Sequence, residues 1–116
     1  MVVIRCWQDA RGRKPVKEWL ADLRQHDRSG ALAVDRLLTK LAKAGRLLVL
    51  PDVRFLGDDL WELRDRTTGP GYRIYYTWVD ESLVVLLVAG EKSTQDRDIK
   101  KARRRLENFG SDDGEQ

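Results

Sequence analysis

The side chains best suited to chemistry lie in and around the stretch GPGYRIYY, residues 69–76. A glycine and proline turn leads into strong strand formers, yet the strand contains Arg73, a permanent cation. Arg64 lies in the preceding apolar segment, and Lys92 follows the apolar run at 83–90. Because an arginine offers a planar set of donors that matches a phosphate, these cations indicate a phosphate-binding site on one face of a sheet.

Side chains alternate across a strand, so the two faces of the predicted strand 72–79 differ. One face carries Tyr72, Ile74, Tyr76 and Trp78, and the other carries Arg73, Tyr75 and Thr77. If this strand pairs with the predicted strand 60–66 across the turn, Arg64 and Arg73 share one open face. The alternative for this face is a cross-strand ion pair between Arg73 and Glu62, and the register decides between the two.

A second cationic region follows Lys92. Apolar residues at helical spacing predict a last amphipathic helix, which Ser93 or Thr94 can cap and which Gly110 ends. Its basic residues are candidates, together with Tyr75, for binding RNA: Lys100, Lys101, Arg103, Arg104 and Arg105. The alternative is that these charges form only a solvated helix face.

The remaining pattern predicts how these residues are positioned. A helix beginning at Pro15 and a second helix capped by Ser29 and closed by Gly45 form a helical hairpin. Strands are predicted at 2–7, 52–56, 60–66, 72–79 and 83–90. Successive strands joined by short turns pair antiparallel, and helices grouped before and after them predict an α+β fold. We expect one domain over 1–110 and a disordered acidic tail over 111–116.

Composition limits the classes of function. The chain has 116 residues, a net charge of +3 and a pI near 9.2, and three acidic residues lie in its last six positions. The excess positive charge therefore lies on 1–110, which favours an anionic partner, with solubility as the alternative. Cys6 has no second cysteine to pair with, which fits a reducing compartment. No apolar run suits a membrane span and no signal-peptide pattern is present, so we expect a cytoplasmic protein.

The site is expected to need no metal or cofactor. One cysteine and one histidine supply no usable ligand set, and no nucleotide-binding glycine motif occurs. The histidine, His26, falls in the predicted loop between the first two helices.

Four segments in series resemble the RelE/ParE superfamily of bacterial toxins, and in particular its HigB-like branch of addiction-module killer proteins. These segments are LWELR, GPGYRIYY, LLVAGEK and STQDRDIKKA, at 60–64, 69–76, 86–92 and 93–102. The resemblance implies a small antiparallel sheet flanked by helices. It also implies a metal-independent endoribonuclease that cuts messenger RNA on the ribosome and is neutralised by a cognate antitoxin, of helix-turn-helix type, in a hetero-oligomer.

By the same resemblance, Arg73 stabilises the scissile phosphate, and Lys92 and Arg64 are further basic positions of the site. The chain departs from the RNA-cleaving relatives at the start of the last helix, where Gln95-Asp96-Arg97-Asp98 holds no histidine or tyrosine. The general base is therefore open among Asp96, Asp98, Glu62 and Tyr75. Two other functions stay open: a non-enzymatic toxin that poisons DNA gyrase, and a catalytically silent RNA-binding domain.

Overall fold

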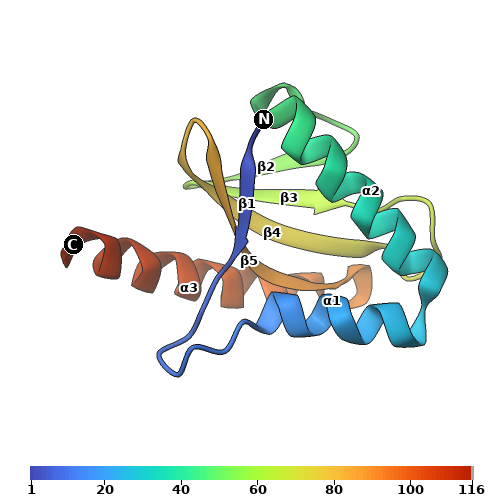
Figure 1. The fold of residues 1–116 in the computed structure, drawn as a ribbon, viewed down its shortest axis with the longest axis horizontal. Coiled ribbons are helices and arrows are strands. Elements are labelled where there is room, and N and C mark those ends of the chain that lie inside the picture. Colours follow the sequence, from blue (N-terminus) through green and yellow to red (C-terminus); the bar gives the residue numbers. More distant parts are fainter. Residues whose placement is uncertain (116) are drawn as a thin grey trace.

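The computed structural model describes the backbone of residues 1–115 and the side chains of residues 1–109. Two helices precede most of a five-stranded sheet and one helix follows it (Figure 1). The helices are α1 (Pro15–His26), α2 (Arg28–Ala44) and α3 (Gln95–Glu115), and the strands are β1 (Val3–Cys6), β2 (Val53–Gly57), β3 (Leu60–Arg64), β4 (Tyr72–Asp80) and β5 (Leu83–Glu91). Short 3₁₀ turns cover Gly45–Leu47 and Lys92–Thr94. This arrangement confirms the predicted α+β, RelE-like fold.

The sheet has the strand order β1-β5-β4-β3-β2. The three hairpins from β2 to β5 are antiparallel, as the short turns predict. Strand β1 instead pairs in parallel with β5, from Val3 opposite Leu83 to Cys6 opposite Leu86. Because α1 and α2 separate β1 from the other strands, the chain can return in the same direction. The central strands β4 and β5 therefore each have a neighbouring strand on both edges.

Each face of the sheet packs against different helices. On one face, Leu63, Ile74 and Tyr76 join a core with apolar residues of α1 and α2. On the other face, Tyr75 and apolar residues of β5 pack with Ala102 of α3. The alternation predicted for the strand at 72–79 is therefore confirmed.

The start of α2 differs from the prediction. Asp27, not Ser29, caps this helix, because its carboxylate accepts a hydrogen bond from the backbone N–H of Gly30 at 2.9 Å. The same carboxylate accepts the phenol hydroxyl of Tyr72 at 2.6 Å, which ties the helix start to β4. The predicted start of α1 at Pro15 and the closure of α2 by Gly45, with a φ of 57°, are confirmed.

The end of β5 leads directly into α3. The sequence offers Ser93 or Thr94 as the cap, and the structure places Thr94 in a capping box with Glu91 at the short 3₁₀ turn that precedes the helix. The predicted end of this helix at Gly110 is wrong, because the backbone of α3 continues as a helix to Glu115. The side chains of the predicted acidic tail at 111–116 lie outside the described part of the structure.

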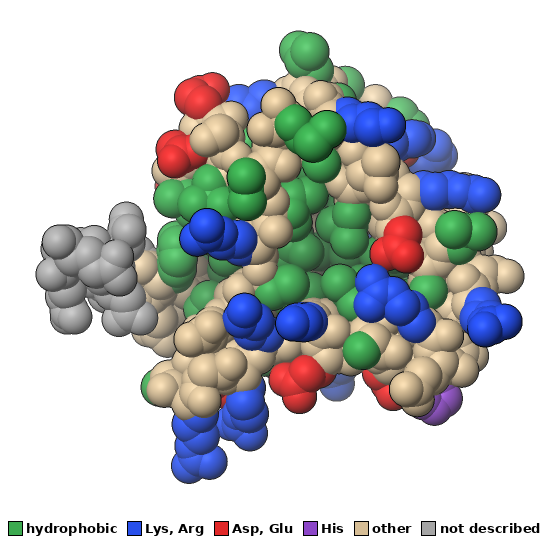
Figure 2. Space-filling view, viewed as in Figure 1, with side chains coloured by type: hydrophobic (Ala, Val, Ile, Leu, Met, Phe, Trp, Pro, Cys, Tyr) green, Lys and Arg blue, Asp and Glu red, His purple; other side chains and the backbone are tan. Residues whose placement is uncertain are grey.

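On the face drawn in Figure 2, basic side chains are spread out and do not form one patch. Figure 2 shows lysines and arginines distributed around an apolar hollow bordered by α1, α2 and β1. Lys14, Lys17 and Arg5 line one cavity on this side of the molecule. Because the basic side chains are distributed in this way, the site is better located by the hydrogen-bond and ion-pair partners of each cation than by net charge.

No helix in the described part of the chain is long and apolar enough to cross a membrane.

Candidate functional site

Arg64 and Arg73 are direct cross-strand neighbours. Arg64 of β3 pairs with Arg73 of β4, and Glu62 pairs with Tyr75. The two arginines therefore lie on the same face of the sheet, as the alternation predicts. Like charges directly opposite each other destabilise a sheet unless an opposite charge balances them. This pairing marks a place where an anion would be favourable.

Arg73 does not reach solvent, and this part of the prediction is wrong. Its side chain is 4% exposed, and its Nη1 atom donates to the carbonyl oxygens of Asp65, Gly71 and Tyr72 at 2.9, 3.0 and 3.1 Å. The turn between β3 and β4 folds back over the guanidinium, and α3 packs on the same face of the sheet. Arg73 therefore holds the turn in place, and only its remaining donors are left for a phosphate.

The alternative ion pair between Arg73 and Glu62 is not the arrangement found. Glu62 is fully buried, and its Oε1 atom lies 3.5 Å from Nε of Arg64. Its Oε2 atom accepts a hydrogen bond of 2.6 Å from Nε2 of Gln95, in the first turn of α3. Sequence reasoning assigned no role to Gln95, because nothing local indicates a contact across 33 positions. Glu62 thus links α3 to Arg64.

Four buried polar atoms of this face have no well-formed hydrogen bond among the described residues, although Oε1 of Glu62 and Nε of Arg64 form an ion pair at 3.5 Å and the Tyr75 hydroxyl interacts with the Glu62 carboxylate. They are Oε1 of Glu62, Nε of Arg64, Nε of Arg73 and the hydroxyl of Tyr75. All four belong to facing positions of β3 and β4. An unsatisfied buried polar group typically costs about 1–3 kcal/mol, so a cluster of them needs an explanation other than stability. A bound polar ligand would supply the missing partners.

Tyr75 can donate a proton in a hydrogen bond but is not suited to act as a base. Burial raises the pKa of Tyr75 well above its usual range, and the carboxylates of Glu62 and Asp98 raise it further. The phenol therefore stays protonated at neutral pH. Of the four candidate bases, the three carboxylates remain.

Asp98 is held against the sheet at the end of β5. Its carboxylate is buried and accepts the hydroxyl of Thr94 at 2.6 Å. A Cβ atom at position 90 would lie 2.0 Å from the Asp98 carboxylate, so this close approach requires Gly90. Asp98 therefore serves first to dock α3.

Among the residues that the structure describes, no three histidine, cysteine or acidic side chains are grouped as a metal ion would need.

The start of α3 carries the open part of the site. A hollow of about 360 Å³ is lined by Lys92, Gln95, Asp96 and their neighbours up to Arg97. Lys92 and Asp96 are exposed there, and the side chain of Arg64 is 26% exposed. Lys92 is fixed by its backbone N–H, which donates to the carbonyl of Gly71 at 2.9 Å. The exposed cations of this hollow are therefore Lys92 and Arg97, while the partly exposed Arg64 lines a separate cleft beside α2.

The basic residues of α3 have unequal environments. Arg103 donates to the carbonyls of Leu56 and Gly57, at 2.9 and 3.4 Å. Arg105 donates to the carbonyl of Leu87 at 2.6 Å and stacks on the ring of Trp7 at 4.5 Å. These two arginines bind α3 to the sheet.

The other basic residues of this helix have different surroundings. Lys100 and Arg104 are exposed, and Lys101 lines a separate cavity with Trp19 of α1. Any contact with RNA through the helix falls first to Lys100 and Arg104, and it remains a prediction.

Asp65 is a further buried residue that sequence reasoning missed. Its carboxylate accepts the backbone N–H and the hydroxyl of Thr67, at 2.9 and 2.7 Å, and the hydroxyl of Thr68. Burial acts to raise the pKa of Asp65, but these hydrogen bonds outweigh it and hold the pKa below its usual value. The segment Asp-Arg-Thr-Thr is a signal for such a turn, because aspartate and threonine side chains bond their own backbone. Asp65 shapes the turn that closes over Arg73.

The comparison with known families covers the whole of this site. Residues 18–107 match the family model described as phage derived protein Gp49-like (DUF891). The chain belongs to this Gp49-like family. An uncharacterized protein of Haemophilus influenzae (strain ATCC 51907 / DSM 11121 / KW20 / Rd) is 42% identical over 59 residues, which are 51% of this chain and 59% of that protein. The chain thus spans less than two thirds of the length of this relative, so the match establishes neither an activity nor a partner for the chain.

Proposed function

We propose that this Gp49-like protein is the toxin of a type II toxin–antitoxin pair and cleaves messenger RNA on the ribosome. The observation that supports this most is the arginine pair on β3 and β4, whose Nε atoms are buried without a well-formed hydrogen bond. A phosphodiester would balance the two charges and provide acceptors for the free donors. The resemblance of the site segments to RelE- and HigB-like toxins supports the same proposal.

The reaction is attack of a ribose 2′-hydroxyl on the adjacent phosphorus. The 2′-oxygen bonds to phosphorus, the bond to the 5′-oxygen breaks, and the products are a 2′,3′-cyclic phosphate and a 5′-hydroxyl. Arg64 and Lys92 bind the phosphate and stabilise the charge that grows on its oxygens. Arg73 supports them from behind by holding the turn that positions Gly71 beside Lys92.

Two proton transfers complete the cleavage reaction. Asp96 is the one exposed carboxylate among the candidate bases and lies in the same hollow as Lys92, so it accepts the proton of the 2′-hydroxyl. Lys92 then gives a proton to the leaving 5′-oxygen. Glu62 and Asp98 are positioning residues in this scheme, because both are buried and hold Arg64, Gln95 and Thr94.

The test is to express the chain and to map new 5′ ends on a reporter transcript, with and without translation. Cuts confined to translated message support the proposal. Arg64→Gln and Lys92→Gln should each lower cleavage by about 10²–10³, the usual cost of removing one preorganised donor. Arg28→Gln, an exposed arginine of α2 outside the site, is the matched control and should cleave normally. Untouched message in the parent protein contradicts the proposal.

One observation favours a second function, that of a non-enzymatic toxin acting on DNA gyrase. The phenol of Tyr75 is sealed and Arg73 is buried, so the site has few groups free for catalysis. Altered plasmid supercoiling together with intact message would support this reading. Absence of any growth effect or cleavage, with RNA binding retained, would support a silent RNA-binding domain.

The partner is proposed to be an antitoxin of helix-turn-helix type that forms a hetero-oligomer with this chain. Co-expression with the product of a neighbouring gene should restore growth if that product is the antitoxin. Purification of both proteins as one complex would identify the pair.

A further inference from the structure

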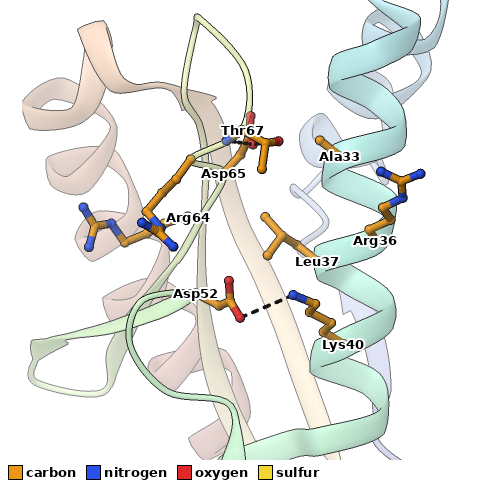
Figure 3. A pocket seen from close by; sticks show the side chains of 9 residues that line it. Ala33, Arg36, Leu37, Lys40, Asp52, Arg64, Asp65 and Thr67 are labelled. Atoms are coloured by element: carbon orange, nitrogen blue, oxygen red, sulfur yellow. Dashed lines mark hydrogen bonds and ion pairs between the residues drawn. The ribbon is translucent and has the colours of Figure 1, made fainter.

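A second cationic cleft lies between α2 and the turn that joins β3 to β4. It encloses about 140 Å³ and is lined by Leu37, Arg36 and Lys40 of α2 and by Asp52 and the segment 64–67 opposite. Figure 3 shows α2 on one side and Asp52, Asp65 and Thr67 on the other, with Leu37 and Lys40 directed across the gap. Arg36 lies on the outer rim. The cleft therefore joins a helix and a turn that are distant in the sequence.

Cations outnumber carboxylates in this cleft. Four basic side chains, those of Arg36, Lys40, Arg64 and Arg66, line it together with two acidic ones. Both carboxylates are already engaged, because Asp52 pairs with Lys40 at 3.6 Å and Asp65 accepts the hydroxyls of Thr67 and Thr68. In the described part of the chain, Arg36 and Arg66 have no hydrogen-bond or ion-pair partner from their side chains. Two cations are thus free for an anion.

Arg64 connects this cleft to the candidate site. Its guanidinium is paired with Glu62, whose other oxygen is bound by Gln95 at the hollow of α3. Its backbone N–H donates to the carbonyl of Asp52 at 2.8 Å, and its side chain also lines the cleft. Arg64 therefore lines the cleft at the end of the sheet, and Glu62 and Gln95 link it to the hollow on the face that α3 covers. A chain of phosphates could pass from the hollow to the cleft around this end of the sheet, at Arg64.

We propose that the cleft between α2 and the β3–β4 turn binds a second phosphate of the same single-stranded RNA. This inference rests on the proposed function, since it takes the phosphate at Arg64 and Lys92 as the first. Arg66 and Arg36 bind the second phosphate by charge-assisted hydrogen bonds, and Lys40 joins them when it leaves Asp52. The cleft contacts the RNA backbone and not the bases, so it adds binding affinity without sequence preference.

The experiment measures binding of the full chain to a short single-stranded RNA with methylated 2′-hydroxyls, which cannot be cleaved. Fluorescence anisotropy is recorded over a range of salt concentrations for the parent and for Arg36→Gln/Arg66→Gln. The double variant should bind about tenfold more weakly at low salt, and its salt slope should fall by about 0.7, the value for one lost phosphate contact on a single strand. Arg24→Gln/Arg28→Gln, two exposed arginines of α1 and α2 outside the cleft, should leave the slope nearly unchanged.

Asp52→Asn provides a variant of opposite sign. It frees Lys40 and keeps the backbone carbonyl that Arg64 requires, so RNA binding should tighten. Inorganic phosphate is the second ligand, and it should compete only weakly because it lacks the contacts on both sides of Arg64.

The outcomes separate the two proposals. If the parent binds RNA and the double variant has the parent's slope, the cleft is not a phosphate site, whatever the cleavage assay shows. If the parent binds RNA with the expected changes but cuts no message, the cleft inference stands and the nuclease proposal fails. A parent protein that neither binds RNA nor cuts message overturns both. If inorganic phosphate competes as strongly as RNA does, the proposal that one RNA occupies both phosphate sites is wrong.

Discussion

The two faces of β3 and β4 are equally hidden from solvent but differ in how their polar groups are satisfied. On the face that packs against α1 and α2, the hydroxyl of Tyr72 donates to Asp27, and Ile74 and Tyr76 pack in the larger core. On the α3 face, Tyr75 and Arg73 are as deeply buried, yet each has a polar atom without a well-formed hydrogen bond. Burial alone therefore does not distinguish core residues from site residues. The two groups differ in whether their buried polar atoms are hydrogen-bonded, and this difference indicates that the polar side chains of the α3 face serve to bind a ligand.

The largest expected difference between the faces is in stability. Tyr76→Ala removes a buried ring that stacks with Trp61 and should lower the free energy of unfolding by about 3–5 kcal/mol. Tyr75→Phe removes only a hydroxyl that has no well-formed hydrogen bond, so stability should change by less than about 1 kcal/mol or increase. Urea unfolding of both variants measures the contrast. A loss of several kcal/mol in Tyr75→Phe would contradict the view that this phenol is unsatisfied.

A smaller effect is expected from the charge between the arginines. Glu62→Gln keeps the shape of the side chain but leaves Arg64 and Arg73 facing each other without a nearby paired carboxylate. We expect a loss of about 1–3 kcal/mol, which a bound anion should partly recover. Thermal unfolding with added phosphate or with chloride at equal ionic strength measures this.

The control for this charge is Glu81→Gln. The side chain of Glu81 is 90% exposed and pairs with Arg46 at 3.7 Å, so its loss should matter by less than about 0.5 kcal/mol. If phosphate stabilises Glu62→Gln no more than it stabilises Glu81→Gln, the arginine pair does not act as an anion site.

Local patterns were enough to predict which residues share a face. Strand alternation and the turn between the two strands place Arg64 beside Arg73, and the short turns predict the antiparallel hairpins. Neither signal depends on distant parts of the chain. The Gp49-like match over 18–107 agrees with the span that the motifs cover.

Contacts between distant segments could not be predicted in the same way. Arg73 is buried because the turn carrying Asp65 and Gly71 returns over it, and Gln95 reaches Glu62 only after α3 docks. The parallel pairing of β1 with β5 likewise joins segments at opposite ends of the fold. The charge pattern predicted a site, whereas the degree of burial of each cation depended on tertiary packing.

The smallest expected effect concerns the satisfied tyrosine of the other face. The hydrogen bond from Tyr72 is the largest of the interactions that hold the pKa of Asp27 below its usual value, followed by the backbone N–H of Gly30. A lowered pKa in the folded state stabilises the protein above the pKa of the unfolded chain, about 3.9 for aspartate, and this contribution is lost as pH falls through the folded value. Tyr72→Phe removes the donor and should therefore be less stable than the parent at neutral pH.

The difference between Tyr72→Phe and the parent should shrink as the pH falls below about 4, because protonated Asp27 no longer gains from the bond. Urea midpoints at neutral and at acid pH measure this change. Tyr76→Phe is the matched control on the same face, and no carboxylate bond of Tyr76 occurs among the described residues, so its effect should not depend on pH in this range. If the Tyr72→Phe difference is the same at both pH values, the bond acts without the charge of Asp27, and the satisfied face owes its stability to packing alone.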